Sequence, residues 1–281
     1  MNLLAARRMA VAKLDAAGVP DARLDAVILL AHALGTTRAA LALTPSQTEL
    51  APDQLRGLEQ ALNARAARQP ISQILGARLF WGREFAVTSD VLDPRPETEI
   101  LVAAALHHPF ASVLDLGTGS GCILLTLLAE RPEARGVGVD LSRAALLVAQ
   151  RNCERLGLTE RAGFVQGSWF DPVPGRFDLI ISNPPYIAEC EMARLSPEVR
   201  SWEPRLALTP GGDGLAAYRA ICAGATAHLS PGGWLMVEIG PRQGRDVAGL
   251  FQAAGLAAIA VLPDMDGRNR VVAGRYLPET A

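Results

Sequence analysis

The stretch SVLDLGTGSGCILLTLLAER, residues 112–131, decides the fold expected for this chain of 281 residues. Its first part, SVLDLG, predicts a buried strand, and its last part, CILLTLLAER, predicts a helix. Gly117, Gly119 and Gly121 lie between them and allow a sharp turn with close backbone approach to a ligand. Backbone N–H groups at the start of the helix would face that ligand. A tight turn without a ligand is the alternative, and the strand–glycine–helix context favours a binding site.

Patterns typical of strands and helices continue to alternate after this stretch. Further strands are predicted by GVGVD, AGFVQG, FDLIISN and GGWLMVEIG, with helical patterns such as SRAALLVAQRNCERLG and DGLAAYRAICAGATAHL between them. The last two strands, LAAIAVLP and RVVAGRYL, are separated by a short loop and should pair antiparallel. The alternation predicts an α/β fold, with a doubly wound, mostly parallel sheet and an antiparallel C-terminal strand.

The N-terminal quarter has a different pattern. Residues 1–75 show apolar residues at helical spacing and predict a small all-helical domain. Residues 76–93 contain two short β-like runs around Trp81-Gly82, which predict a hairpin linker. Residues 94–281 are then expected to form the α/β domain, where Pro96 with Glu97 and Glu99 could open a helix.

Composition excludes several classes of protein. The net charge is -2, and acidic and basic residues nearly balance in residues 1–75, so we expect no direct nucleic-acid binding. The four cysteines and four histidines are scattered, so neither a metal site nor a disulfide framework is expected, and the thiols should be reduced and buried. Arg7 and Arg8 interrupt the first apolar residues, and no run is long enough to cross a bilayer. We therefore expect a cytoplasmic protein without membrane contact.

Two residues after neighbouring strands could complete a nucleoside pocket. Asp140 ends GVGVD and could accept both hydroxyls of a ribose, because Ser142 is free to cap the next helix instead. Trp169 follows the third strand of this domain, where an indole could cover an adenine ring, although packing at the domain edge would also explain it. The spacing GxGxG, with Cys122 in place of a further glycine, is the form common in S-adenosylmethionine enzymes. Asp140 and the glycines alone do not separate this donor from NAD.

The fourth strand of the domain ends in Asn183-Pro184-Pro185-Tyr186. Proline fixes its own φ and drives the preceding residue into an extended conformation, so this corner is stiff. The Asn183 side-chain oxygen and the Pro184 carbonyl could accept the two hydrogens of a planar NH₂ group, against which Tyr186 could stack. Such acceptors would orient a conjugated, weakly nucleophilic nitrogen and favour the positive charge that develops on it during methylation. A strand-ending turn explains one proline but hardly all four residues.

The glycine loop, Asp140 and Asn183–Tyr186 together resemble class I methyltransferases that act on a conjugated exocyclic nitrogen. That resemblance leaves adenine N6, guanine N2 and glutamine N5 open as acceptors. Residues 68–102, 203–219 and 264–272 narrow the choice, because they resemble the release factor glutamine methyltransferase family. The most specific part is PRPETE, residues 94–99, which relatives acting on a ribosomal-protein glutamine replace. Gln73 departs from the family, which commonly has tyrosine there.

This resemblance implies a substrate and a set of site residues. The substrate is the glutamine in the Gly-Gly-Gln motif of class I peptide-chain release factors, whose methylation at N5 supports translation termination. The methyl donor S-adenosylmethionine, which leaves as S-adenosylhomocysteine, would be bound by Gly117, Thr118, Gly119, Ser120, Gly121, Asp140, Trp169 and Asn183. The catalytic corner, which also holds the glutamine amide, would be Asn183, Pro184, Pro185 and Tyr186. The helices of residues 1–75 would contact the release factor or serve only as a stabilising cap. We expect a monomer.

Two other functions stay open at this point. A methyltransferase acting on a ribosomal-protein glutamine or on a nucleic-acid base could use the same corner, but a base methyltransferase should show a basic groove. A non-catalytic module could keep the donor pocket, but it would not need the intact Asn183–Tyr186 corner.

Overall fold

The computed structural model describes residues 1–171 and 173–278, which divide into two compact units. One unit comprises Met1–Gly76 together with Ser196–Trp202. The other unit runs from Ala77 to Leu195 and continues from Glu203. The domain boundaries expected from sequence stay a prediction, and this division differs from them by assigning residues 196–202 to the helical unit.

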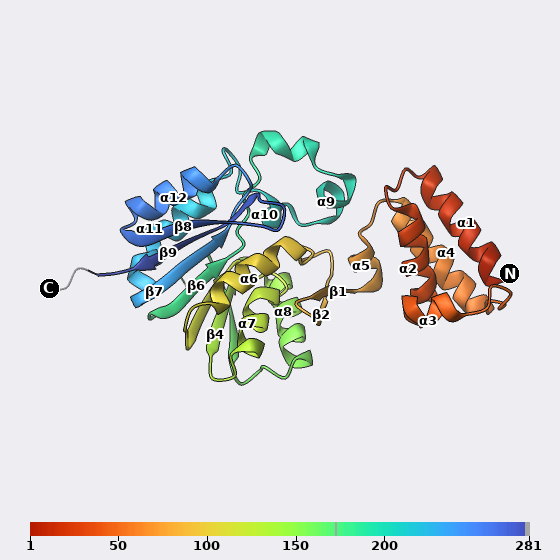
Figure 1. Cartoon of the computed structure of the whole chain (residues 1–281), viewed down its shortest axis with the longest axis horizontal. Coiled ribbons are helices and arrows are strands. Elements are labelled where there is room, and N and C mark those ends of the chain that lie inside the picture. The colour runs from red at the N-terminus through yellow and green to blue at the C-terminus, as the bar shows by residue number, and fades with distance from the viewer. Residues whose placement is uncertain (172, 279–281) are drawn as a thin grey trace. The chain divides into compact units, whose positions relative to one another are not determined.

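The first unit is built from helices that pack around apolar side chains (Figure 1). Its core contains Leu14, Leu29, Leu58 and Leu62, none of which is exposed to solvent. Amphipathic helices of this length gain most of their stability from such packing. The helices are α1 (Leu3–Ala16), α2 (Ala22–Ala33), α3 (Arg38–Leu43), α4 (Pro52–Ala66), α5 (Ile71–Leu75) and α9 (Pro197–Trp202).

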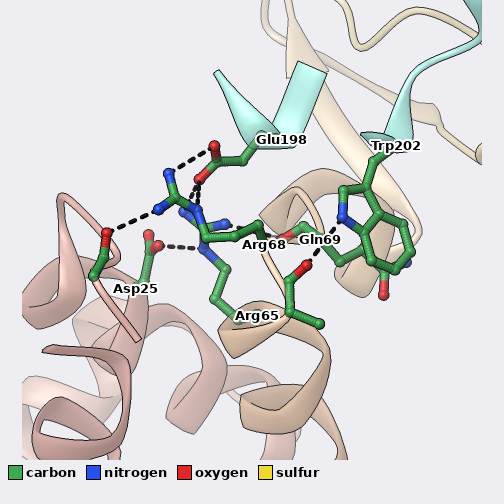
Figure 2. A network of polar contacts seen from close by, with 8 residues as sticks. Asp25, Arg65, Arg68, Gln69, Glu198 and Trp202 are labelled. Carbon is green, nitrogen blue, oxygen red and sulfur yellow. Dashed lines mark hydrogen bonds and ion pairs between the residues drawn. The ribbon is translucent and has the colours of Figure 1, made fainter. Parts of the chain in front are cut away.

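Helix α9 is attached to this unit by polar contacts (Figure 2). Glu198 accepts hydrogen bonds from Arg65 Nη2 at 3.0 Å and from Arg68 Nε at 2.7 Å. The Trp202 indole donates to the Ala67 carbonyl at 3.1 Å, and Gln73 Nε2 donates to the Trp202 carbonyl at 2.9 Å. Gln73, the residue that departs from the family pattern, thus helps to hold the end of α9.

The second unit contains a seven-stranded sheet with the order β5-β4-β3-β6-β7-β9-β8. The strands β5, β4, β3, β6 and β7 run parallel to one another, whereas β9 runs antiparallel to both β7 and β8. The predicted doubly wound sheet with an antiparallel C-terminal strand is therefore confirmed. The strands are β3 (Ser112–Leu116), β4 (Arg135–Asp140), β5 (Ala162–Gln166), β6 (Phe177–Ser182), β7 (Leu229–Glu238), β8 (Leu256–Pro263) and β9 (Asn269–Tyr276).

Helices cover both faces of this sheet (Figure 1). Alternate residues of β3 contact different cores: Val113 packs with Leu101 and Leu124, whereas Leu114 packs with Tyr218 and its neighbours. This is the alternation that a pleated strand buried on both faces requires. The helical segments are η1 (Pro96–Thr98), α6 (Glu99–Leu106), α7 (Cys122–Glu130), α8 (Arg143–Arg155), η2 (Glu189–Arg194), α10 (Arg205–Leu208), α11 (Ala216–His228) and α12 (Gly244–Ala253).

The predicted hairpin is present and belongs to the α/β unit. Strands β1 (Ala77–Phe80) and β2 (Arg83–Ala86) pair antiparallel. Trp81 and Gly82 connect them with φ angles of 50° and 69°, the geometry that a two-residue hairpin turn favours. Phe80 and Phe85 are buried in the same core as α6 and α7, so the hairpin is packed into this unit rather than being a free linker.

One expectation about the cysteines is wrong. Cys122, Cys153 and Cys222 are buried as expected, but Cys190 is exposed. Cys190 lies in η2, which follows the proline corner along the chain. None of the helices in the described ranges is long and apolar enough to cross a membrane.

Candidate active site

A cavity of about 600 Å³ lies at the carboxyl ends of the central strands. Its walls include the turns that follow β3, β4 and β6, which meet at one edge because these strands are parallel and adjacent. The volume lies within the range of pockets for small organic ligands, about 300–1,000 Å³. The chain order reverses between β3 and β6, so the cavity is at the topological switch point where such sheets bind ligands.

The glycine loop forms one wall of the cavity. Gly117, Thr118, Gly119 and Ser120 line it, whereas Gly121 does not. Gly117 and Gly119 have φ angles of 72° and 54°, which only glycine adopts without strain. Gly121 serves packing instead: a Cβ there would lie 3.2 Å from the Ala149 Cβ of α8.

Asp140 joins this loop to the neighbouring strand. Its Oδ2 accepts the Gly119 backbone N–H at 2.9 Å, and its Oδ1 accepts the Ser142 backbone N–H at 2.9 Å. Ser142 caps α8 by accepting from the Ala145 N–H, as predicted. Asp140 also lines the cavity, and each carboxylate oxygen can accept a second hydrogen bond. Burial raises the pKa of Asp140, and its backbone hydrogen bonds oppose that rise.

The loop rests on a buried carboxyl group that sequence reasoning missed. Asp115, in β3, is completely buried and accepts a hydrogen bond from Thr118 Oγ1 at 2.7 Å. Burial raises the pKa of Asp115 to about 7. Its position two residues before Gly117 was the available signal, since an acidic residue inside a buried strand is uncommon.

Trp169, which follows β5, contributes an aromatic side chain to the cavity wall. It lines the cavity and packs partly against the core that contains Val139 and Phe170. Its φ angle is 48°, an unusual value for a bulky residue, so the surrounding packing holds the indole in place.

The corner after β6 contributes Asn183 and Pro185 to the cavity wall, but not Pro184 or Tyr186. Asn183 Nδ2 donates to Thr98 Oγ1 at 3.1 Å. The other end of the amide, Oδ1, is buried and has no hydrogen-bond partner within the described part of the chain. A buried acceptor without a partner is costly, so a ligand NH group that reached it would remove that cost.

Contacts on the far side of the corner keep its shape. Gln243 Nε2 donates to the Tyr186 carbonyl at 2.9 Å. Gly214, with φ 79°, approaches so closely that a Cβ would lie 2.5 Å from the same carbonyl oxygen. The residue after the corner is fixed as well, since the Ile187 N–H donates to the Leu208 carbonyl at 3.0 Å. Sequence reasoning assigned no role to Gln243 or Gly214.

Glu238, at the end of β7, was also missed. It is 1% exposed, and it accepts from Thr98 Oγ1 at 2.6 Å and, over a longer 3.4 Å, from the Tyr186 hydroxyl. Burial raises the pKa of Glu238 to about 7, although Thr98, Arg270 and Tyr186 favour its charged form. Ser182 of β6 pairs with Val237 of β7, which places Asn183 and Glu238 at the ends of adjacent strands.

Much of the remaining cavity wall comes from two segments that the sequence marked only by their family resemblance. They are Ser89–Arg95 and Pro204–Pro210, which contribute most of their residues to the lining. Arg95 and Glu203 form an ion pair between them, and Glu203 is nearly inaccessible, with a side chain 1% exposed. Both segments fall in the stretches 68–102 and 203–219 that carry the family resemblance.

Comparison with known proteins agrees with this geometry. Residues 5–76 match the family model of the PrmC N-terminal domain, and residues 88–198 match that of the methyltransferase small domain. The chain is 60% identical to the release factor glutamine methyltransferase of Cereibacter sphaeroides over 98% of its own length and 99% of the relative's. It is 46% identical to the enzyme of the same name from Rhodospirillum rubrum, over 94% of this chain and 82% of that one.

Solved structures of more distant proteins share the fold of this chain. A methyltransferase from Pyrococcus furiosus superimposes with a TM-score of 0.56 at 15% identity, over 77% of this chain and 99% of that chain. The hMettl16 catalytic domain gives a TM-score of 0.59 at 15% identity, over 79% and 84% of the two chains. Fold and site together define an S-adenosylmethionine-dependent methyltransferase. Within that class, the chain belongs to the release factor glutamine methyltransferase family.

Proposed function

We propose that this protein transfers a methyl group from S-adenosylmethionine to the side-chain amide nitrogen, N5, of the glutamine in the Gly-Gly-Gln motif of class I peptide-chain release factors. The observation that carries the proposal is the unpartnered Asn183 Oδ1 beside the cavity, in a chain 60% identical to a release factor glutamine methyltransferase. The reaction belongs to translation termination in the cytoplasm, with the enzyme acting as a monomer and without direct nucleic-acid contact.

The residues present fit the methyl donor. The cavity is large enough for a nucleoside with an amino-acid chain, and the loop Gly117–Ser120 lets the ligand approach the backbone. Asp140 retains acceptor capacity for ribose hydroxyls, and Trp169 offers an aromatic face to the adenine. S-adenosylmethionine supplies an electrophilic methyl group on a sulfonium and leaves as S-adenosylhomocysteine.

The corner acts on the glutamine. An amide nitrogen is a weak nucleophile because its lone pair is conjugated with the carbonyl. Asn183 Oδ1 and the Pro184 carbonyl accept its two hydrogens, fix the direction of its lone pair and stabilise the positive charge that develops on it. Pro185 lines the cavity and keeps this corner rigid. Tyr186, expected from the sequence to stack on the amide group, does not line the cavity and contacts Glu238 through its hydroxyl. The methylated nitrogen then gives up one proton to water.

Residues 1–76 are proposed to contact the release factor. This unit has its own core, and helix α9 is fixed to it through Glu198. The chain leaves the Asn183–Tyr186 corner, passes through η2 and enters α9 at Pro197, so the corner and this helix are joined directly along the chain. The substrate-binding role of the helices rests on this direct chain connection.

The experiment is methyl transfer from labelled S-adenosylmethionine in three parallel reactions. One contains a class I release factor, one its Gly-Gly-Gln variant with alanine in place of glutamine, and one nucleic acid. Label is expected only on the release factor that keeps its glutamine. Label on nucleic acid, or equal label on the alanine variant, would contradict the proposal.

A further inference from the structure

Three side chains from separate elements form a buried chain of hydrogen bonds behind the cavity. Asn183 follows β6, Thr98 ends η1 and Glu238 ends β7. Asn183 Nδ2 donates to Thr98 Oγ1 at 3.1 Å, and Thr98 Oγ1 donates to Glu238 Oε2 at 2.6 Å. Thr98 and Glu238 are 2% and 1% exposed, so water does not compete for these bonds.

The order of donors and acceptors in this chain fixes the orientation of the Asn183 amide. A hydroxyl has one hydrogen, and Thr98 donates it to the Glu238 carboxylate. Thr98 Oγ1 can then only accept a hydrogen bond from Asn183, which turns Nδ2 toward Thr98. If the Asn183 amide were flipped, its Oδ1 would face Thr98 Oγ1. Neither oxygen would then have a hydrogen to share, because the Thr98 hydrogen points to Glu238. Oδ1 is therefore the end of the amide that stays free for a ligand.

We propose that Thr98 and Glu238 are positioning residues that hold the Asn183 amide with Oδ1 available to the substrate nitrogen. This inference rests on the proposed function, because it explains how the corner presents an acceptor rather than a donor to an NH₂ group. It also gives Thr98 of the PRPETE segment a physical connection to the corner 85 residues away.

The geometry distinguishes this role from ordinary packing. Thr98 lines the cavity, so a residue of the same size is needed there whatever its chemistry. Valine has the shape of threonine but cannot accept from Asn183 or donate to Glu238, whereas serine keeps the hydroxyl and loses only a methyl group. If Thr98 served only packing, the valine variant would be more active than the serine variant. If Thr98 positions Asn183, the serine variant should be the more active one.

The test compares Thr98→Val with Thr98→Ser in the full chain. Thr126→Val is the matched control, since Thr126 in α7 is also buried and its hydroxyl has no hydrogen-bond partner among the described residues. With a release factor as substrate, kcat of Thr98→Val should fall about 10- to 100-fold, less than complete loss of the acceptor would give. The KM for release factor should stay within about twofold, because contacts outside the corner dominate binding. Thr98→Ser and Thr126→Val should keep most of the wild-type kcat.

A second measurement follows the amide itself in the donor-free protein. The chain has five asparagines, so ¹⁵N-labelled asparagine gives a small set of side-chain NH₂ signals, and Asn183→Ala identifies one of them. Thr98→Val should shift that signal and speed its hydrogen exchange, whereas Thr126→Val should not. An unchanged signal, or a Thr98→Val enzyme with the kcat of Thr98→Ser, would overturn the inference. Failure of the wild-type protein to methylate release factor would contradict the proposed function instead, and the NH₂ signal would still decide the orientation of Asn183.

Discussion

The Gly119 backbone donates its N–H to Asp140 Oδ2 at 2.9 Å, which ties the glycine loop to the end of the neighbouring strand. The other carboxylate oxygen holds the Ser142 N–H at the same distance. Asp140 therefore has two roles. It stabilises the glycine loop, and it lines the cavity in which ribose hydroxyls would lie. An asparagine at position 140 would be neutral and would offer only one acceptor oxygen for the N–H groups of Gly119 and Ser142.

Substitution Asp140→Asn should weaken donor binding. Loss of a hydrogen bond to a charged group costs about 1.5–3 kcal/mol, which corresponds to a dissociation constant for S-adenosylmethionine raised roughly 10- to 100-fold. Isothermal titration calorimetry measures this directly, with Asp246→Asn on the exposed side of α12 as the matched control. Unchanged affinity in Asp140→Asn would show that the carboxylate is not part of the donor site.

Substitution Asn183→Ala should lower kcat about 10²- to 10³-fold while the protein stays folded. The change removes the acceptor that orients the substrate nitrogen, and loss of one such preorganised group typically costs about 10²–10³ in kcat. Steady-state kinetics measures the loss, and thermal unfolding checks the fold. Retained activity would mean that the corner has only a structural role.

The activity should show an acid limb that depends on Glu238. Burial raises the pKa of this carboxyl group to about 7. The ionised form has no hydrogen to donate and can only accept from Thr98, whereas the protonated acid can donate to Thr98 and reverse the order of the hydrogen bonds. The ionised fraction grows as pH rises, so kcat should increase through pH 7 and fall below it. The titratable groups facing Glu238 are Arg270, Glu97, Tyr186, Tyr218 and Cys122.

Glu238→Gln separates this limb from the titration of Asp115, whose pKa also lies near 7. Glutamine can still accept from Thr98 but does not ionise in this range. Its kcat should therefore vary less with pH than that of the wild-type enzyme. An identical acid limb in both proteins would assign the titration to another group.

Removal of the Glu198 carboxylate should loosen α9 in the helical unit. Glu198→Ala leaves Arg68 without that partner and leaves the buried Arg65 with Asp25 as its one remaining carboxylate partner among the described residues (Figure 2). A buried charge that loses a partner typically costs about 1–3 kcal/mol. Hydrogen exchange of the α9 and α4 amides should accelerate, whereas Glu59→Ala on the exposed face of α4 should change little. Equal protection in both variants would contradict a stabilising role.

The same network should weaken in acid. Burial alone would raise the pKa of Glu198, but hydrogen bonds from Arg68 and Arg65 lower it to about 2. Because the pKa is lower in the folded state, the stabilisation is complete above the unfolded value near 4.5 and is lost as pH falls toward 2. Glu198→Ala should remove this part of the acid dependence of unfolding.

Local patterns were sufficient to predict the α/β fold. The alternation of apolar strands with helices is a property of consecutive residues, and parallel strands bring their following turns to one edge. The glycine loop, Asp140, Trp169 and Asn183 could therefore be grouped from the sequence, and Gly117–Ser120, Asp140, Trp169 and Asn183 all line one cavity. Gly121 could not be separated from the other glycines, because its contact with Ala149 depends on how α7 meets α8.

The supporting residues could not be found in this way. Thr98 and Glu238 are 140 residues apart, and their contact is set by the packing of η1 against the end of β7. In the sequence, Glu238 is simply a polar residue at the end of an apolar strand, which is usually exposed. Residues 196–202 likewise belong to the helical unit because of Glu198 and Trp202, whose partners lie more than a hundred residues earlier.

The central claim is that the corner methylates a glutamine side chain. The most direct measurement is mass spectrometry of a class I release factor after incubation with this protein and S-adenosylmethionine, with fragmentation that locates the added methyl group. The account predicts one methyl group, on the amide nitrogen of the glutamine in Gly-Gly-Gln, and far less of it after the same incubation with Asn183→Ala. A methyl group on another residue, or an unmodified release factor under conditions where nucleic acid is methylated, would contradict it.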